Sequence, residues 1–154
     1  MTLLKFSRNR FFPALEEPLS EVSFGEWLEN PQAHAEARAL VISNDAAVAD
    51  IACDLNGFDV IILDFPAFKD GRAYSQARLL RSRFGYTGEI RARGNVLRDQ
   101  IAFMVRCGFN AFEVDGLDAA SADAALHELS FAYQAAADGV LAVWRQRLKT
   151  AAAA

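Results

Sequence analysis

From residue 39 onward, a short apolar run, a polar turn and an amphipathic stretch follow one another four times. The apolar runs occupy residues 39–43, 60–65, 89–93 and 111–115. Strands that alternate with helices of ten or more residues indicate β/α units with right-handed crossovers and a parallel sheet. The pattern therefore predicts an α/β fold of four β/α units, which form a small parallel sheet or half of a β/α barrel. A half barrel has two open edges, which favours a homodimer.

Amphipathic stretches after these runs predict the helices. They extend from Asn44 or Asp45 to Gly57, from 72 to 84, from Asn95 to Gly108, and from Ser121 to a break at 138–139 that precedes residues 140–148. Capping side chains and glycines mark most of these boundaries. In the third helix, Leu97, Ile101, Met104 and Val105 are expected to form the buried stripe.

The first 38 residues precede this repeat and are expected to form an arm that packs on the core. Within the arm, Ser23-Phe-Gly-Glu26 fits a capping box that opens a short helix reaching Leu28. Residues 39–150 then form a single β/α domain, and residues 151–154 form a frayed tail. With 154 residues, 53% of them hydrophobic, the chain can build one core without disulfides or metal.

The run at residues 89–93 differs from the other three because its character alternates. Ile90 and Ala92 alternate with Arg91 and Arg93, so one face of this strand is apolar and the other is cationic. Burying unpaired cations is costly. We therefore expect this strand at an edge of the sheet or lining a polar mouth.

Several classes of function lack their motifs in this sequence. Cys53 and Cys107 form no C-x-x-C pair, so we expect buried thiols and neither an iron–sulfur cluster nor a zinc site. His34 and His127 stand apart from other potential metal ligands. The sequence also lacks the phosphate-binding loop, the dinucleotide-binding fingerprint, the nucleophile elbow and the zinc-protease motif.

Membrane and secretion signals are also missing. Apolar runs such as residues 39–42 and 60–63 are far too short to span a bilayer, and no signal-peptide pattern follows Met1. We therefore expect a cytoplasmic protein with no membrane partner.

The net charge of −4 conceals one basic segment. Residues 69–106 contain nine Lys or Arg against three Asp or Glu, a net of +6, which leaves −10 for the remainder. Nucleic-acid binding needs a broad positive footprint, so nucleic acid is not expected as a partner. A small anion or an acidic partner surface fits the segment better.

Two cations flank the predicted start of the second helix, in Lys69-Asp-Gly-Arg72. Because cations are disfavoured beside a helix N-terminus, the pair indicates a bound anion, unless Asp70 caps the helix and pairs with Arg72. Arg93-Gly-Asn95 repeats the arrangement at the third helix, with simple capping as the alternative. The anion-binding candidates are Lys69, Arg72, Arg93 and Asn95, and the candidate acid/base groups are Asp64 and Asp115.

Tyr74, Arg78 and Arg81 lie at i, i+4 and i+7 and share one stripe of the second helix. Tyr and Arg are enriched at binding hot spots, so this stripe is a candidate docking surface for an acidic partner. The alternative is a solvated helix face. Some of the arginines also have potential ion-pair partners: Asp99 for Arg106 and Glu113 for Arg91.

In order along the chain, these residues form four blocks. They are Asp64-Phe-Pro-Ala-Phe-Lys-Asp-Gly-Arg-Ala-Tyr-Ser-Gln-Ala-Arg-Leu-Leu-Arg81, Tyr86-Thr-Gly-Glu-Ile-Arg-Ala-Arg-Gly94, Val96-Leu-Arg-Asp-Gln100 and Arg106-Cys-Gly-Phe109. In these blocks the chain resembles the bacterial domain-of-unknown-function family 934, whose members are described as probable oxidoreductases involved in sulfite reduction. The resemblance covers most of the chain. It implies an association with assimilatory sulfite reductase, and so with sulfur assimilation and cysteine biosynthesis, and it supplies no catalytic residues.

Two functions fit these observations. The first is an accessory or docking protein of assimilatory sulfite reduction. It binds the catalytic subunit of sulfite reductase through the stripe of Tyr74, Arg78 and Arg81, called the Tyr74 stripe below. The second is a small-anion or flavin-binding β/α oxidoreductase, in which a flavin phosphate sits on Lys69, Arg72, Gly94 and Asn95. In a third reading, the protein is a scaffold whose arginines only form ion pairs. The sequence leaves open whether the protein is an enzyme and whether it carries a cofactor.

Overall fold

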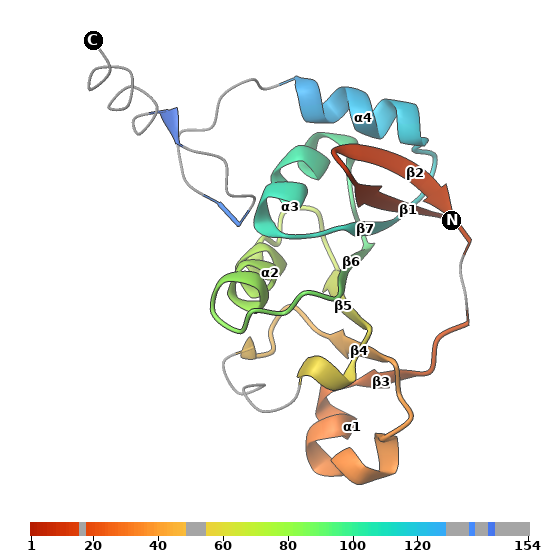
Figure 1. Ribbon diagram of the computed structural model, residues 1–154, viewed down its shortest axis with the longest axis vertical. Coiled ribbons are helices and arrows are strands. Elements are labelled where there is room, and N and C mark those ends of the chain that lie inside the picture. The colour runs from red at the N-terminus through yellow and green to blue at the C-terminus, as the bar shows by residue number, and fades with distance from the viewer. Residues whose placement is uncertain (16–17, 49–54, 129–135, 138–141, 144–154) are drawn as a thin grey trace.

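The computed structural model describes residues 1–15, 18–48, 55–128, 136–137 and 142–143. They form an α/β fold on one seven-stranded mixed sheet with the order β2-β1-β7-β6-β5-β4-β3 (Figure 1). The strands are β1 (Thr2–Ser7), β2 (Arg10–Ala14), β3 (Glu21–Ser23), β4 (Ala39–Ile42), β5 (Val60–Phe65), β6 (Glu89–Gly94) and β7 (Ala111–Val114). Strands β3 to β7 are parallel, whereas β1 is antiparallel to β2 and β7. The predicted α/β class is confirmed.

The helices are α1 (Phe24–Glu29), α2 (Arg72–Ser82), α3 (Ile101–Cys107) and α4 (Ala119–His127), with the 3-10 turns η1 (Pro31–His34), η3 (Leu55–Gly57) and η4 (Arg98–Gln100). Helices α1, α2 and α3 lie between consecutive parallel strands, and α4 follows β7. The four predicted strands are β4 to β7, adjacent and parallel in the sheet. Strand β5 is buried at five of its six positions, which fits its continuous apolarity.

The residues expected to form an arm supply three of the seven strands. Strands β1 and β2 form a hairpin whose turn residues, Arg8 and Asn9, both have positive φ, and β1 also pairs with β7. Strand β3 extends the other end of the sheet. The predicted capping box is confirmed, because Glu26 N–H donates to Ser23 Oγ at 3.3 Å and Ser23 N–H to Glu26 Oε2 at 3.2 Å.

Three predicted helix starts need correction. Residues 43–46 form a turn and not the first turn of a helix, and residues 49–54 lie outside the described ones. Asn95 caps no helix: its N–H donates to Phe65 O at 2.8 Å, and η4 and α3 begin after Leu97. Helix α4 is capped by Asp118, which accepts from Ser121 N–H at 2.7 Å. The predicted break at 138–139 and the tail at 151–154 are also outside the described residues.

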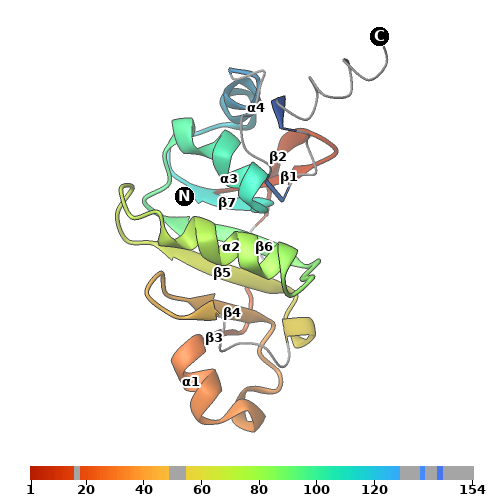
Figure 2. The ribbon, with the colours of Figure 1, turned by 90° about the vertical axis from the view of Figure 1, so that its left-hand side faces the viewer.

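Helices α2 and α3 cover the same face of the sheet (Figure 2). This follows from the strand order, since β5, β6 and β7 step in one direction and right-handed crossovers then place both helices on one side. The main core lies there, between the sheet and apolar residues of α2 and α3 such as Leu80, Ile101 and Met104. On the opposite face, called the second face below, a small cluster of Ala39, Val60 and Ile62 packs with Leu19.

Strand β6 is central and not at an edge, because it pairs with both β5 and β7. Its apolar residues, Ile90 and Ala92, belong to the main core, and Arg91 and Arg93 lie on the second face with acidic partners. Pairing with carboxylates removes the cost that made a central position unfavourable. The expectation of an edge strand was therefore wrong, whereas the two arginines do line a polar pocket.

Two further expectations from the sequence concern the burial of the cysteines and the presence of membrane-spanning helices. Cys107 is buried, as expected, while Cys53 lies outside the described residues. Within the described part of the chain, every helix is too short or too polar to cross a bilayer.

Candidate functional site

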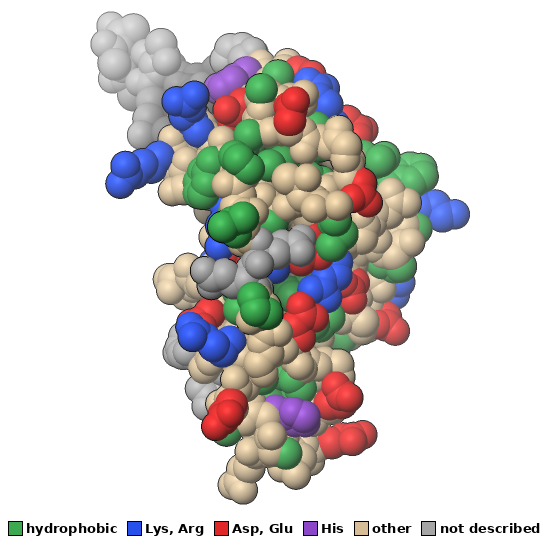
Figure 3. Space-filling view, turned by 90° about the vertical axis from the view of Figure 1, so that its right-hand side faces the viewer, with side chains coloured by type: hydrophobic (Ala, Val, Ile, Leu, Met, Phe, Trp, Pro, Cys, Tyr) green, Lys and Arg blue, Asp and Glu red, His purple; other side chains and the backbone are tan. Residues whose placement is uncertain are grey.

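Charged side chains lie beside one another midway along the second face of the sheet (Figure 3). They form an alternating chain of ion pairs, called the charge network below, in the order Lys5, Glu89, Arg91, Glu113, Arg93 and Glu21. Four strands supply these residues. Successive N···O distances along the network are 2.8, 2.6, 3.2, 2.9 and 2.5 Å.

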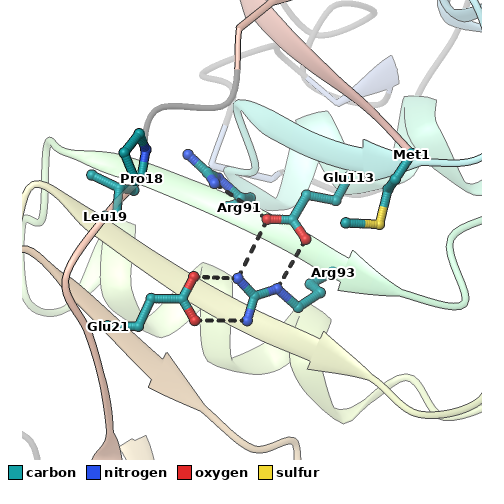
Figure 4. A pocket seen from close by; sticks show the side chains of 7 residues that line it. All are labelled: Met1, Pro18, Leu19, Glu21, Arg91, Arg93 and Glu113. Atoms are coloured by element: carbon teal, nitrogen blue, oxygen red, sulfur yellow. Dashed lines mark hydrogen bonds and ion pairs between the residues drawn. The ribbon is translucent and has the colours of Figure 1, made fainter.

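The centre of the charge network is buried. The side chains of Arg91 and Glu113 are only 7% and 4% exposed. Arg93 is held on two edges, since Glu113 accepts from Nε and Glu21 accepts from both Nη atoms (Figure 4). These carboxylates, Glu21 first, raise the pKa of Arg93, and Arg93 lowers the pKa of Glu21. The network is balanced in charge and satisfies its own hydrogen bonds.

A cavity of about 500 Å³ adjoins the charge network. Pro18 and Leu19, from the segment that crosses the second face before β3, form its wall together with Met1 (Figure 4). Its polar lining consists of Glu21, Arg91, Arg93 and Glu113, which already pair with one another. An anion would have to compete with these carboxylates for the two arginines, so the cavity is not a preformed anion site.

The two candidate acid/base carboxyls lie apart on non-adjacent strands. Asp64, at the end of β5, faces Arg93 in the register of the sheet, and burial raises its pKa. Asp115 follows β7, is largely exposed and pairs with the N-terminal ammonium of Met1 at 3.2 Å. A raised pKa such as that of Asp64 is typical of an acid/base group.

At the start of α2, Arg72 forms an ion pair with Asp70. Arg72 Nε donates to Asp70 Oδ1 at 3.0 Å, and its Nη2 donates to Oδ2 at 2.7 Å. The Arg72 guanidinium lowers the pKa of Asp70 to about 2. The pairing expected as the structural alternative is therefore present and needs no bound anion, but the N-cap of α2 is Gly71 and not Asp70.

The four anion-binding candidates do not converge. Lys69 lies in the loop before α2 and Arg72 is the first residue of that helix, whereas Arg93 lies on the second face of the sheet, bound to Glu21 and Glu113. Asn95 is exposed after β6. A Cβ on Gly94 would lie 2.5 Å from Phe65 O, so close packing between β5 and β6 explains this glycine without a phosphate.

Two buried amide atoms beside Arg72 have no hydrogen-bond partner among the residues that the structure describes. Gln76 Nε2 donates to the carbonyls of Ser43 and Ala46 at 2.8 and 3.0 Å, which fixes Oε1 as an unpaired acceptor. Asn44 Oδ1 accepts from Arg72 Nη2 at 3.5 Å, which leaves Nδ2 as an unpaired donor. Both side chains are more than nine-tenths buried. Buried polar atoms normally form hydrogen bonds. Two buried polar atoms without such a bond, where the turn after β4 contacts α2, are therefore unusual.

The Tyr74 stripe does not form a continuous outward face. Arg81 Nε donates to Gly108 O at 2.9 Å, and its Nη1 donates to Tyr86 O and Gly88 O at 2.7 and 2.8 Å. The Tyr74 ring is half-buried, and burial raises its pKa to about 12. Arg78 alone is exposed. Helical spacing placed the three correctly on one stripe, but neighbouring loops cover its Arg81 end.

An apolar surface that the sequence did not indicate lies at the carboxyl ends of β5 and β6. Phe68, Leu97 and Phe103 are 53%, 40% and 50% exposed. Gln100 joins their loops, since its Nε2 donates to Phe68 O at 2.8 Å and its Oε1 accepts from Leu97 N–H at 3.2 Å. The buried stripe predicted for α3 included Leu97, which is exposed because α3 begins only at Ile101.

The ring of Phe103 extends this surface to helix α2. The centroid of this ring lies 5.1 Å from that of Tyr74. Tyr74 precedes Arg78, which is exposed, by one turn of α2. Lys69 is exposed beside Phe68. We call Phe68, Leu97, Phe103, Tyr74, Lys69 and Arg78 together the docking surface.

No cluster of three or more His, Cys, Asp or Glu that could hold a metal ion occurs among the described residues. Comparison with protein-family models gave one match, to residues 39–144, with the description "Bacterial protein of unknown function (DUF934)". None of the curated proteins compared matches the chain. The family match includes the docking surface and most of the charge network, but not Glu21 or Lys5.

Proposed function

Because the chain belongs to the DUF934 family, whose model covers residues 39–144, we propose that it is an accessory protein that docks onto a partner in assimilatory sulfite reduction. The single observation that carries the docking role is the grouping of Phe68, Leu97 and Phe103. Each exposes between 40% and 53% of its surface. Phe68 and Leu97 lie on two loops that Gln100 joins by hydrogen bonds, and Phe103 lies in the first turn of α3. Exposed apolar side chains that cluster mark interaction sites more often than those that stand singly.

The composition of the docking surface resembles that of known hot spots. Phe103 and Tyr74 form an aromatic pair with ring centroids 5.1 Å apart, and Arg78 lies one helical turn from Tyr74. Tyr and Arg are enriched where binding energy concentrates, and aromatic residues generally are enriched in interface cores. The Tyr74 ring is already held against Phe65 and Phe109, so binding orders few further side chains on this surface.

Charge makes a smaller contribution to docking than the sequence indicated. Five cations of the basic segment bind carboxylates or carbonyls within the chain: Arg72, Arg81, Arg91, Arg93 and Arg98. Lys69 and Arg78 are the cations of the docking surface, and neither pairs with a carboxylate among the described residues. We therefore propose a partner surface with apolar side chains at its centre and one or two carboxylates at its rim.

The resemblance to proteins described in sulfite reduction supports the catalytic subunit of sulfite reductase as this partner. Photo-crosslinking in cells tests the pairing: p-benzoylphenylalanine is placed at Leu97 or, as a matched exposed leucine on α1, at Leu28. We expect the Leu97 probe to capture the catalytic subunit and the Leu28 probe not to. If the Leu97 probe captures a second copy of this chain, the docking surface is instead the interface of a homodimer. Equal capture of the catalytic subunit from Leu97 and Leu28 would contradict the proposed role of the docking surface.

A second candidate function, a small-anion or flavin-binding oxidoreductase, is favoured by the unpaired Asn44 Nδ2 and Gln76 Oε1 beside Arg72 and the start of α2. A ligand that accepts from the first atom and donates to the second would satisfy both. Titration calorimetry with sulfite, phosphate and flavin mononucleotide tests this function on the wild type and on Asn44→Ala. Heat that is lost in the variant supports it, and the absence of heat with every ligand contradicts it.

A further inference from the structure

A second cavity, of about 310 Å³, lies at the end of the molecule that carries α1. Trp27 of α1 and Phe58, just before β5, form its walls, with Gln32, His34 and Ala35 from η1 and its end, and Gly57 from η3. We propose that this cavity binds a small, neutral, aromatic ligand. It is remote from helices α2 and α3 and the loops before them, which carry the docking surface (Figure 2), and the proposal does not depend on docking.

The walls of this cavity are held in place by the fold. The rings of Trp27 and Phe58 meet edge to face with centroids 5.8 Å apart. The hydroxyl of Tyr86 donates to Phe58 O at 3.1 Å, which fixes the Phe58 wall from the core side. On the opposite side, Asn30 Oδ1 accepts from Ala33 N–H at 3.3 Å and caps η1. A preformed site loses little freedom when a ligand binds.

The lining indicates the chemistry of the ligand. Among the described residues, no Lys, Arg, Asp or Glu lines the cavity, so a charged ligand would lose hydration without gaining a counter-charge. The aromatic walls favour a planar ring, which packs edge to face or offset against them. Gln32 and His34 supply hydrogen-bonding groups for one polar substituent.

The size of the cavity suits a ligand of one or two rings. Small-molecule sites occupy roughly 300 to 1,000 Å³, and most are apolar pockets with a few polar groups. At 310 Å³ this cavity lies at the lower limit of that range. Gly57 leaves part of the space open, because a Cβ at this position would meet no atom within 4 Å.

Tryptophan fluorescence tests the proposal with three probes of similar size. The chain has two tryptophans, so Trp144→Phe leaves Trp27 as the only reporter. At pH 8, we expect benzamide to change the Trp27 emission saturably with a Kd of about 1 mM or tighter. Benzoate, which has the same shape with a negative charge, and cyclohexanecarboxamide, which is not aromatic, should each bind at least about tenfold more weakly.

Filling the cavity provides the matched control. Gly57→Leu should weaken benzamide binding at least about tenfold, whereas Gly25→Leu, at a glycine with equally open surroundings on α1, should leave it unchanged. If Gly57→Leu lowers the melting temperature, Ala35→Phe, directly after η1, replaces it as the variant that fills the cavity. Benzamide binding that is absent, that benzoate equals, or that survives in a folded, filled variant would overturn the proposal.

Discussion

Arg81 and Gly108 join the ends of two neighbouring helices: Arg81 Nε donates to Gly108 O at 2.9 Å, and a Cβ on Gly108 would lie 2.4 Å from Arg81 Cγ. The same guanidinium also binds the carbonyls of Tyr86 and Gly88. Arg81→Met should therefore destabilise the protein by about 3 kcal/mol, since it leaves three carbonyls without a donor. Arg78→Met, on the exposed side of α2, should change stability by less than about 0.5 kcal/mol. Urea denaturation compares them, and equal effects would contradict the role of Arg81.

Glu113 is the centre of the charge network, because it binds both Arg91 and Arg93. Glu113→Gln should cost about 3 kcal/mol, since it leaves the buried Arg91 and the partly buried Arg93 with too few negative partners. Glu21→Gln, at the exposed end of the network, should cost less than about 1 kcal/mol. Thermal unfolding at low and high salt measures both. A small loss for Glu113→Gln would show that water solvates the arginines.

Gly94 and Gly85 both have positive φ but different surroundings. A Cβ on Gly94 would lie 2.5 Å from the backbone oxygen of Phe65, whereas a Cβ on Gly85 would meet no atom within 4 Å. Gly85→Ala should cost about 1 kcal/mol for its backbone conformation alone. Gly94→Ala should cost about 3 kcal/mol, since neither strand can move away without disturbing the sheet. Equal losses in chemical denaturation would show that β5 and β6 separate easily.

Asp64 should make stability depend on pH. Burial raises its pKa in the folded state, against a smaller opposing effect of Arg93, so the ionised carboxylate is disfavoured by folding. Its stabilising contribution is complete below the unfolded pKa of about 3.9 and is lost as pH rises through the folded pKa. Asp64→Asn should thus raise the melting temperature at pH 7, and the gain should disappear near pH 3. A loss of stability at pH 7 would show that attraction to Arg93 prevails.

The sequence predicted the four central strands because each is a continuous or alternating apolar run of the right length. It did not predict β1 to β3, since their pairing depends on partners far along the chain, such as β7 for β1. Counting charges located the basic segment but could not predict which of its arginines bind other groups within the chain. Arg93 binds Glu21, 72 residues away, and Arg81 binds backbone carbonyls, which no side-chain pattern reveals. The sequence named Lys69, Tyr74 and Arg78 of the docking surface but not its exposed apolar residues, and Leu97 was assigned to a buried stripe because α3 begins later than expected.

The central claim, docking through Phe68 and Phe103, is tested most directly by measuring the affinity of the purified chain for the sulfite reductase catalytic subunit by biolayer interferometry. The Phe68→Glu/Phe103→Glu double variant should bind at least about 100-fold more weakly, because it places two carboxylates where apolar contact is expected. Leu28→Glu, at another half-exposed apolar position, should bind within about threefold of the wild type. Wild-type affinity in the double variant, or no binding by the wild type itself, would contradict the account.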